Sequence, residues 1–117
     1  MTKITTVEDA LDLVYEMPER FHEVPVEYRS IDVCLLAIIS FGSICEHVPE
    51  EHHSESFFLE AVRTNCDGKA LKYIPMEYRT LKICEKAVSR FPEAIEYVPE
   101  SLRSKVSSAL SGSQHRS

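Results

Sequence analysis

The sequence predicts an all-α fold of short tandem helix-turn-helix repeats, each about 24 residues long, stacked as a small solenoid-like domain. Three observations predict it. A branched aliphatic residue followed by proline recurs along the chain, a hydroxyl residue follows each proline by five positions, and apolar residues then recur at helical spacing. No stretch sustains the alternation of apolar and polar residues that is typical of strands.

The repeated dipeptides are Val24-Pro25, Val48-Pro49, Ile74-Pro75 and Val98-Pro99. Serine and threonine are good N-cap residues, because their side-chain oxygen accepts a hydrogen bond from a free N–H of the first helical turn. The sequence therefore predicts that five helices start after hydroxyl residues at the same phase of the repeat, namely Thr6, Ser30, Ser54, Thr80 and Ser104.

Each long helix is expected to span about three turns and to be followed by a residue that ends it or starts a shorter helix. These residues are Pro18, Gly42, Gly68 and Pro92. Proline suits the first turn of a helix, and glycine allows a left-handed cap. A short apolar helix and a corner at the next proline complete the unit.

The repeat divides one domain, residues 1–112, into units at 6–25, 26–49, 50–75 and 76–99 with a partial cap at 100–112. Residues 113–117 are expected to form a frayed tail. One unit cannot bury its own apolar face, so stability must come from neighbouring units packed in series.

A resemblance to a known family of domains rests on two segments, AlaLeuLysTyrIleProMetGluTyrArg at 70–79 and AlaIleGluTyrValProGluSerLeuArg at 94–103. They resemble the repeats of a bacterial helical-repeat domain of unknown function, of the type A-L-x-Y-V-P-E-x-L-R followed by x-C-x-x-A-V. The resemblance covers residues 20–104 and is weakest at 50–56. It implies a fold, and it transfers no activity and no site residue.

The 117 residues carry 13 Lys and Arg against 19 Asp and Glu, a formal net charge of −6. Residues 1–62 contain 3 cations and 13 anions (3 − 13 = −10), whereas residues 63–117 contain 10 and 6 (10 − 6 = +4). An acidic chain is not expected to bind nucleic acid. The start lacks a signal-like apolar segment, and the uncharged run at 33–45 is shorter than a membrane span of about 20 residues. We expect a cytoplasmic protein without a membrane partner.

Sulfur and imidazole side chains gather at Cys45, His47, His52 and His53, and these are zinc-ligand types. Their spacing, C-x-H-x4-H-H, matches no common zinc pattern. The alternative is structural: Cys45 takes the core position of Phe21 and Ile95, and the histidines replace tyrosine or occupy a corner. We expect no metal, and keep these four residues as the alternative site.

Catalytic signatures are absent from the sequence, which has no G-x-S-x-G, no glycine-rich phosphate loop and no H-E-x-x-H. Cys34 and Cys84 share a repeat phase with Ala10 and Phe58, so they are expected to be core thiols. Cys66 lies in an insertion and is expected to be exposed. We expect no enzyme activity and no cofactor.

The segment from Ile31 to Phe41 is apolar almost all round, with Asp32 and Ser40 as its polar residues. Either this helix is covered on both sides by neighbouring units, or part of it is an exposed docking face formed by Leu35, Leu36 and Ile39.

The sequence favours a non-catalytic protein-binding module, an acidic inhibitor, immunity-type or adaptor protein whose N-terminal half docks a basic partner. The candidate partner-binding residues are Glu16, Glu19, Glu23, Glu27, Glu46, Glu50, Glu51, Leu35, Leu36 and Ile39. The alternative is a structural protein that forms a homo-oligomer through the 31–41 helix; a zinc-binding protein is a further one.

Overall fold

The computed structural model describes residues 4–115, and within that range it contains helices and turns but no strand, which confirms the all-α fold class. The long helices are α1 (Val7–Glu16), α2 (Ile31–Ser40), α3 (Glu55–Thr64), α5 (Leu81–Arg90) and α6 (Glu100–His115). The short helices are η1 (Pro18–Glu23), η3 (Gly42–His47), α4 (Ala70–Tyr73) and η6 (Pro92–Tyr97). Single 3₁₀ turns form the corners: η2 (Val26–Tyr28), η4 (Glu50–His52) and η5 (Met76–Tyr78).

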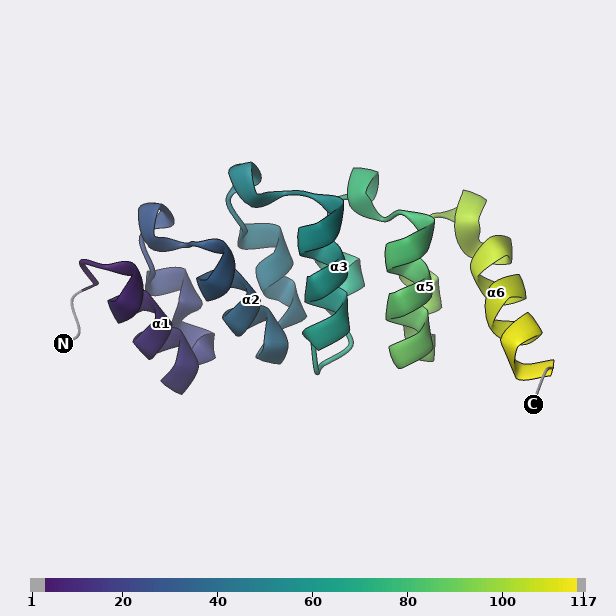
Figure 1. The fold of residues 1–117 in the computed structure, drawn as a ribbon, viewed down its shortest axis with the longest axis horizontal. Coiled ribbons are helices and arrows are strands. Elements are labelled where there is room, and N and C mark those ends of the chain that lie inside the picture. Colours follow the sequence, from purple (N-terminus) through teal and green to yellow (C-terminus); the bar gives the residue numbers. More distant parts are fainter. Residues whose placement is uncertain (1–3, 116–117) are drawn as a thin grey trace.

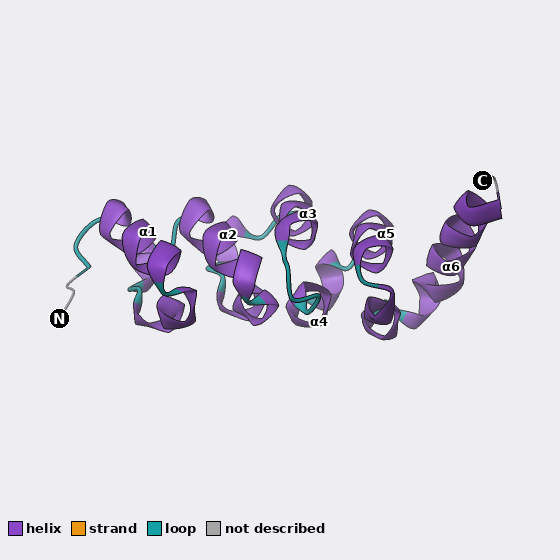
Figure 2. Cartoon of the chain, turned by 90° about the horizontal axis from the view of Figure 1, so that it is seen from below, coloured by secondary structure: helices purple, strands orange, loops and turns teal. Residues whose placement is uncertain are grey.

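The helices follow one another along the longest dimension of the molecule, which measures 54 × 26 × 19 Å (Figure 1). Each long helix packs against the next, α1 on α2, α2 on α3, α3 on α5 and α5 on α6. Seen from below, α1, α2, α3 and α5 form one layer and the short helices form a second (Figure 2). We call these the long-helix layer and the short-helix layer. Helices α1 and α6 therefore lie at opposite ends of the molecule.

Four of the five predicted helix starts are confirmed. The side-chain oxygens of Thr6, Ser30, Ser54 and Thr80 accept hydrogen bonds from the N–H three residues ahead, at 3.0–3.5 Å. Each such cap contributes about 1 kcal/mol to helix stability.

The prediction at Ser104 is wrong, because α6 begins at Glu100 and passes through Ser104 without a break. Residues 100–103 of this last unit favour a helix, with leucine at 102 where the earlier corners have Tyr28, His52 and Tyr78. The helix also continues to His115 rather than ending at 112, since a single glycine such as Gly112 costs only about 1 kcal/mol. Part of the expected tail is therefore helical, and its residues 116–117 lie outside the described residues.

The core lies between the two layers. Each of α1, α2, α3 and α5 turns one apolar stripe inward, as α2 does with Val33, Cys34, Ala37 and Ile38, all fully buried. From the short-helix layer Phe21, Cys45, Leu71 and Ala94 meet these stripes. Cys34 and Cys84 are core thiols as predicted.

The two glycines at predicted helix ends have other roles. Gly42 does not adopt a left-handed conformation; it opens η3, and a Cβ there would collide with the backbone of Lys69 and Ala70. Gly68 is left-handed, with φ 73°, but it lies in the loop after α3, whose C-cap is Asn65. Glycine at 42 thus permits η3 to approach the backbone at the start of α4 closely. The position of Gly42 within its own repeat does not reveal this contact with another unit.

The insertion after α3 joins unit two to unit three. The buried side-chain amide of Asn65 donates to the carbonyl oxygen of Ile38 at 2.7 Å. The N–H of Cys66 donates to the carbonyl oxygen of Ile39, also at 2.7 Å. These carbonyls belong to the last turn of α2, which has no partner for them within the helix. The carboxylate of Asp67 accepts from the N–H of Gly42 at 3.2 Å. The inserted residues therefore cap the C-terminal end of α2, the long helix of the preceding unit.

Candidate functional site

Most of the predicted partner-binding carboxylates lie on the short-helix layer and at the corners within residues 19–51. Glu19 and Glu23 are on η1 and Glu46 is on η3, while Glu27 is on corner η2 and Glu50 and Glu51 are on corner η4. All six side chains are exposed. We call these six residues the acidic face. Glu16 lies apart from them, at the end of α1 in the long-helix layer.

Few cations balance the acidic face. Arg20 pairs with Glu23, its Nη2 lying 2.6 Å from Oε1, and this bond lowers the pKa of the Glu23 carboxyl. Arg29 is directed at carbonyl oxygens: its Nε donates to Val24 at 2.9 Å and its Nη1 to His47 at 3.3 Å. Lys3, the remaining cation of residues 1–62, lies outside the described residues. The carboxylates of Glu19, Glu27, Glu50 and Glu51 form no ion pair with the described side chains.

The apolar candidates lie on the opposite layer. Leu35 and Leu36 are half-buried and Ile39 is exposed, on the side of α2 turned away from its buried stripe. Neighbouring helices α1 and α3 pack against α2 and its inner stripe is buried, while its outer stripe is partly exposed to solvent. The structure does not bring Leu35, Leu36 and Ile39 together with the acidic face. A partner that touched both would have to reach around an edge of the molecule.

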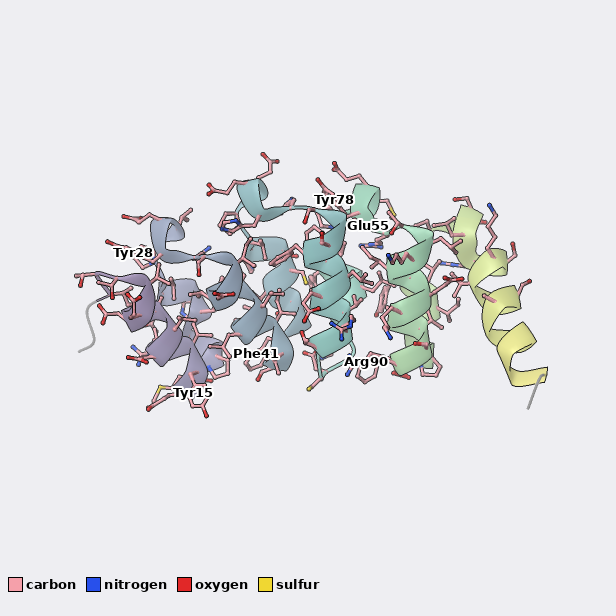
Figure 3. All side chains as sticks on the ribbon, viewed as in Figure 1. Tyr15, Tyr28, Phe41, Glu55, Tyr78 and Arg90 are labelled. Atoms are coloured by element: carbon pink, nitrogen blue, oxygen red, sulfur yellow. The ribbon has the colours of Figure 1, made fainter. Side chains whose placement is uncertain are left out.

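Exposed large apolar side chains concentrate in the first two units. Tyr15 is 77% exposed, and Ile31, Met17, Ile39 and Phe41 are 37–46% exposed. Tyr15 and Phe41 lie at the same edge, at the ends of α1 and α2 (Figure 3). The equivalent outward positions of α3 and α5 carry charged residues such as Arg63 and Lys86. The two halves of the long-helix layer therefore differ in chemistry.

The alternative zinc site is not assembled. Cys45 is fully buried, whereas Nε2 of His52 donates to the carbonyl oxygen of Arg29 at 2.8 Å and Nε2 of His53 donates to that of Val48 at 3.1 Å. His47 is exposed beside Glu46. Among residues with described side chains, no three His, Cys, Asp or Glu converge on a metal position. His52 and His53 instead bond the corner at η4 to the backbone at Arg29 and Val48.

The thiols divide into a buried set and one exposed residue. Burial raises the pKa of Cys34 and of Cys45 to about 12 and that of Cys84 to about 11. Such thiols stay protonated at neutral pH and are poor nucleophiles. Cys66 is exposed, as predicted, and its Sγ lies 3.6 Å from the carbonyl oxygen of Thr64.

An arginine that recurs at one phase of the repeat, at 29, 79 and 103, is a structural element that the sequence reasoning missed. Arg79 donates from Nε to the carbonyl oxygen of Ile74 at 2.8 Å and from Nη2 to that of Lys72 at 2.7 Å, both in the preceding unit. Its Nη1 donates to the carbonyl oxygen of Tyr97, in its own unit, at 3.0 Å. Arg29 makes the equivalent three bonds, and Arg103 makes the two that reach the preceding unit. We call this arrangement the arginine clamp. His53 takes its place in the third unit, and the sequence signal was the arginine at a fixed phase ahead of the cap residue.

A basic groove lies on the long-helix layer of the second half. It has a volume of about 440 Å³ and is lined by Leu59, Arg63, Lys82, Glu85, Lys86, Ser89 and Ala109. Its sides are α3 and α5, and α6 rises beside it because that helix leaves the row at an angle (Figure 2). We call it the α3–α5 groove. A smaller hollow of about 240 Å³ beside α1 is lined by Asp9, Asp12, Leu13, Glu16, Met17 and Arg20.

The fold defines an all-α protein whose helical units are joined in series by side chains that bond to carbonyl oxygens of the neighbouring unit. Residues 54–103 match a family described as a domain of unknown function, DUF4116. This segment begins at the N-cap of α3 and ends at Arg103, so it includes both sides of the α3–α5 groove and leaves the acidic face outside. No curated protein and no solved structure matches the chain significantly. No helix within the described residues has the length and apolar character needed to cross a membrane.

Proposed function

We propose that this protein is a non-catalytic binding module whose acidic face docks a basic surface of another protein. The observation that carries the proposal is that four carboxylates of that face, Glu19, Glu27, Glu50 and Glu51, form no ion pair with the described side chains. Of the described cations nearby, Arg29 bonds to backbone carbonyls and Arg20 pairs with Glu23. Such a field speeds the encounter with a basic partner and disfavours acidic ones. An inhibitor, immunity-type or adaptor role is consistent with this chemistry.

The architecture supports the proposal because the short helices of successive units follow one another in one layer. Glu19 and Glu46 come from different units of that layer, so a partner can contact several units at once. Serial helical units commonly bind through such extended surfaces, which here would make the chain a short solenoid-like scaffold.

The test compares three immobilised forms of the full chain: the wild type, Glu19→Lys/Glu23→Lys/Glu27→Lys, and Glu77→Lys/Glu93→Lys/Glu96→Lys. The second variant changes the formal charge equally, at exposed positions of the corner and short helix of the second half. Proteins from the source cells are captured at about 50 mM and about 500 mM salt, because screening becomes severe over that range.

We expect a basic protein to be retained by the wild type and by the second-half variant, to be lost from the acidic-face variant, and to be released at high salt. Its association rate with each purified form, measured by surface plasmon resonance, should fall in the same order. Equal rates for all three forms would contradict the proposal. Circular dichroism verifies that each variant remains helical.

A further inference from the structure

The α3–α5 groove combines an apolar floor with a basic rim. Leu59 is half-buried at its floor, and the aliphatic stems of Lys82 and Lys86 extend the apolar surface. Its three cations face one anion, Glu85. Arg63 is paired with Glu60, but the ion pairs among the described side chains involve neither lysine. A matching occupant presents apolar and acidic side chains on one helical face.

The exposed side of α1 has that chemistry. Leu11 and Tyr15 form an apolar pair one turn apart, and Asp12 and Glu16 form an acidic pair beside it. We call these four residues the α1 ridge. Tyr15 is 77% exposed, so the chain's own core does not account for an aromatic residue there. Asp12 and Glu16 also line the hollow beside α1, which leaves them accessible.

The two surfaces match in spacing as well as in charge. Asp12 and Glu16 are four residues apart on α1, and Lys82 and Lys86 are four residues apart on α5, so each pair spans one helical turn. With the carboxylates opposite the lysines, the neighbouring apolar pair of α1 faces the row of Leu59 and Arg63 on α3. The Tyr15 ring then meets a cationic rim, a contact that aromatic faces favour.

We propose that the chain associates with a second copy of itself head to tail, with the α1 ridge of one copy seated in the α3–α5 groove of the next. The two surfaces lie in different halves of the chain and differ in chemistry, so the contact is heterologous and builds assemblies larger than a dimer, as rings or open chains. It uses neither the acidic face nor the outer stripe of α2. It therefore stands or fails independently of the proposed function.

The test is a charge swap on the full chain. The groove variant is Lys82→Glu/Lys86→Glu, the ridge variant is Asp12→Lys/Glu16→Lys, and the swapped variant carries all four changes. A matched control, Lys69→Glu/Lys72→Glu, makes the groove variant's change of charge at exposed lysines outside the groove. Sedimentation velocity measures the mass-average mass up to about 500 µM, at which a contact with a Kd of about 100 µM is well populated.

We expect the wild type, the control and the swapped variant to associate at about 50 mM salt and to dissociate at about 500 mM. The groove and ridge variants should each associate about tenfold or more weakly, because attraction becomes repulsion, and mixing them should restore association. The ridge variant discriminates against a general charge effect: its net charge is closer to zero than that of the wild type, so reduced overall repulsion alone would strengthen association.

The proposal is overturned if the wild type remains monomeric throughout this range. It is equally overturned if the groove and ridge variants associate as the wild type does, or if the swapped variant fails to associate while circular dichroism shows it folded. The variant Ile39→Glu tests a seam through α2: if it dissociates the protein while the groove variant does not, the contact lies on α2 and not in the groove.

Discussion

The side-chain amide of Asn65 caps a helix of the neighbouring unit, because its Nδ2 donates to the carbonyl oxygen of Ile38 at 2.7 Å. Its Oδ1 accepts from the N–H of Ala70 at 3.4 Å, so one buried side chain satisfies groups on both sides of a junction. Arg90 adds a second bridge from the other side, donating to the carbonyl oxygens of Val62 and Asn65 at 2.7 and 2.5 Å. Helix ends here are completed by the next unit along the chain.

The variant Asn65→Ala should lower the free energy of unfolding by about 1–3 kcal/mol, since it leaves a buried carbonyl and a buried N–H without their partner. Urea unfolding followed by circular dichroism measures the change. Ser89→Ala, at an exposed position of α5, is the control and should change stability by less than about 0.5 kcal/mol. A loss no larger than that of the control would show that Asn65 does not stabilise the junction.

The arginine clamp gives a second prediction. Arg79→Ala should cost about 1–3 kcal/mol, because three backbone carbonyls lose a charged donor. Arg79→Lys should recover only a small part, since a single ammonium group cannot reach three acceptors in the geometry of the guanidinium fork. Arg63→Ala is a matched control: this exposed arginine pairs only with Glu60, and its removal should cost less than about 1 kcal/mol. Full recovery by lysine would mean that charge alone matters at this position.

Periodic features of the fold were predictable from sequence, and contacts between units were not. Thr6, Ser30, Ser54 and Thr80 recur at one phase and cap by a local rule, so their roles follow from spacing. Asn65 stands where α1 and α2 have the apolar residues Met17 and Phe41, and its role depends on the carbonyl of Ile38 in another unit, which no local spacing reveals.

The candidate site shows the same division. The acidic content of the first half is a property of composition, but its separation from Leu35, Leu36 and Ile39 depends on which layer each helix joins. The α3–α5 groove was not predicted either, because Leu59 and Lys86 come together only when α3 packs on α5.

Gly42 gives a third prediction. In Gly42→Ala the new methyl group would collide with the backbone at Ala70, which cannot move aside as a flexible side chain would. We expect a loss of about 1–3 kcal/mol on urea unfolding. Gly68→Ala should cost about 1–2 kcal/mol for a different reason, its left-handed φ of 73°. Ser40→Ala, at an exposed helical position, should be neutral or slightly stabilising, and an equal effect at Gly42 would disprove the close approach.

The thiols should react with the disulfide reagent DTNB in a fast phase and a slow phase. In the folded protein at pH 8, Cys66 should react rapidly because it is exposed. Cys34, Cys45 and Cys84 should react only after unfolding, since they are buried and burial raises their pKa to about 11–12. The variant Cys66→Ser should abolish the rapid phase and leave the slow one. Rapid reaction of more than one thiol in the native protein would show that the core opens readily.

The same buried thiols make stability depend on alkaline pH. Their pKa is raised in the folded state above the ordinary value of 9.0, so above pH 9 the unfolded chain releases protons that the folded chain keeps. The stabilising contribution is therefore complete below pH 9 and is lost as pH rises toward 11–12. The free energy of unfolding should fall between pH 9 and pH 10 by up to about 1.4 kcal/mol for each buried thiol. Urea unfolding at pH 8, 9 and 10 measures the slope, and Cys34→Ala should flatten it even though that variant is less stable at every pH. An unchanged slope in Cys34→Ala would show that this thiol does not contribute to the alkaline loss.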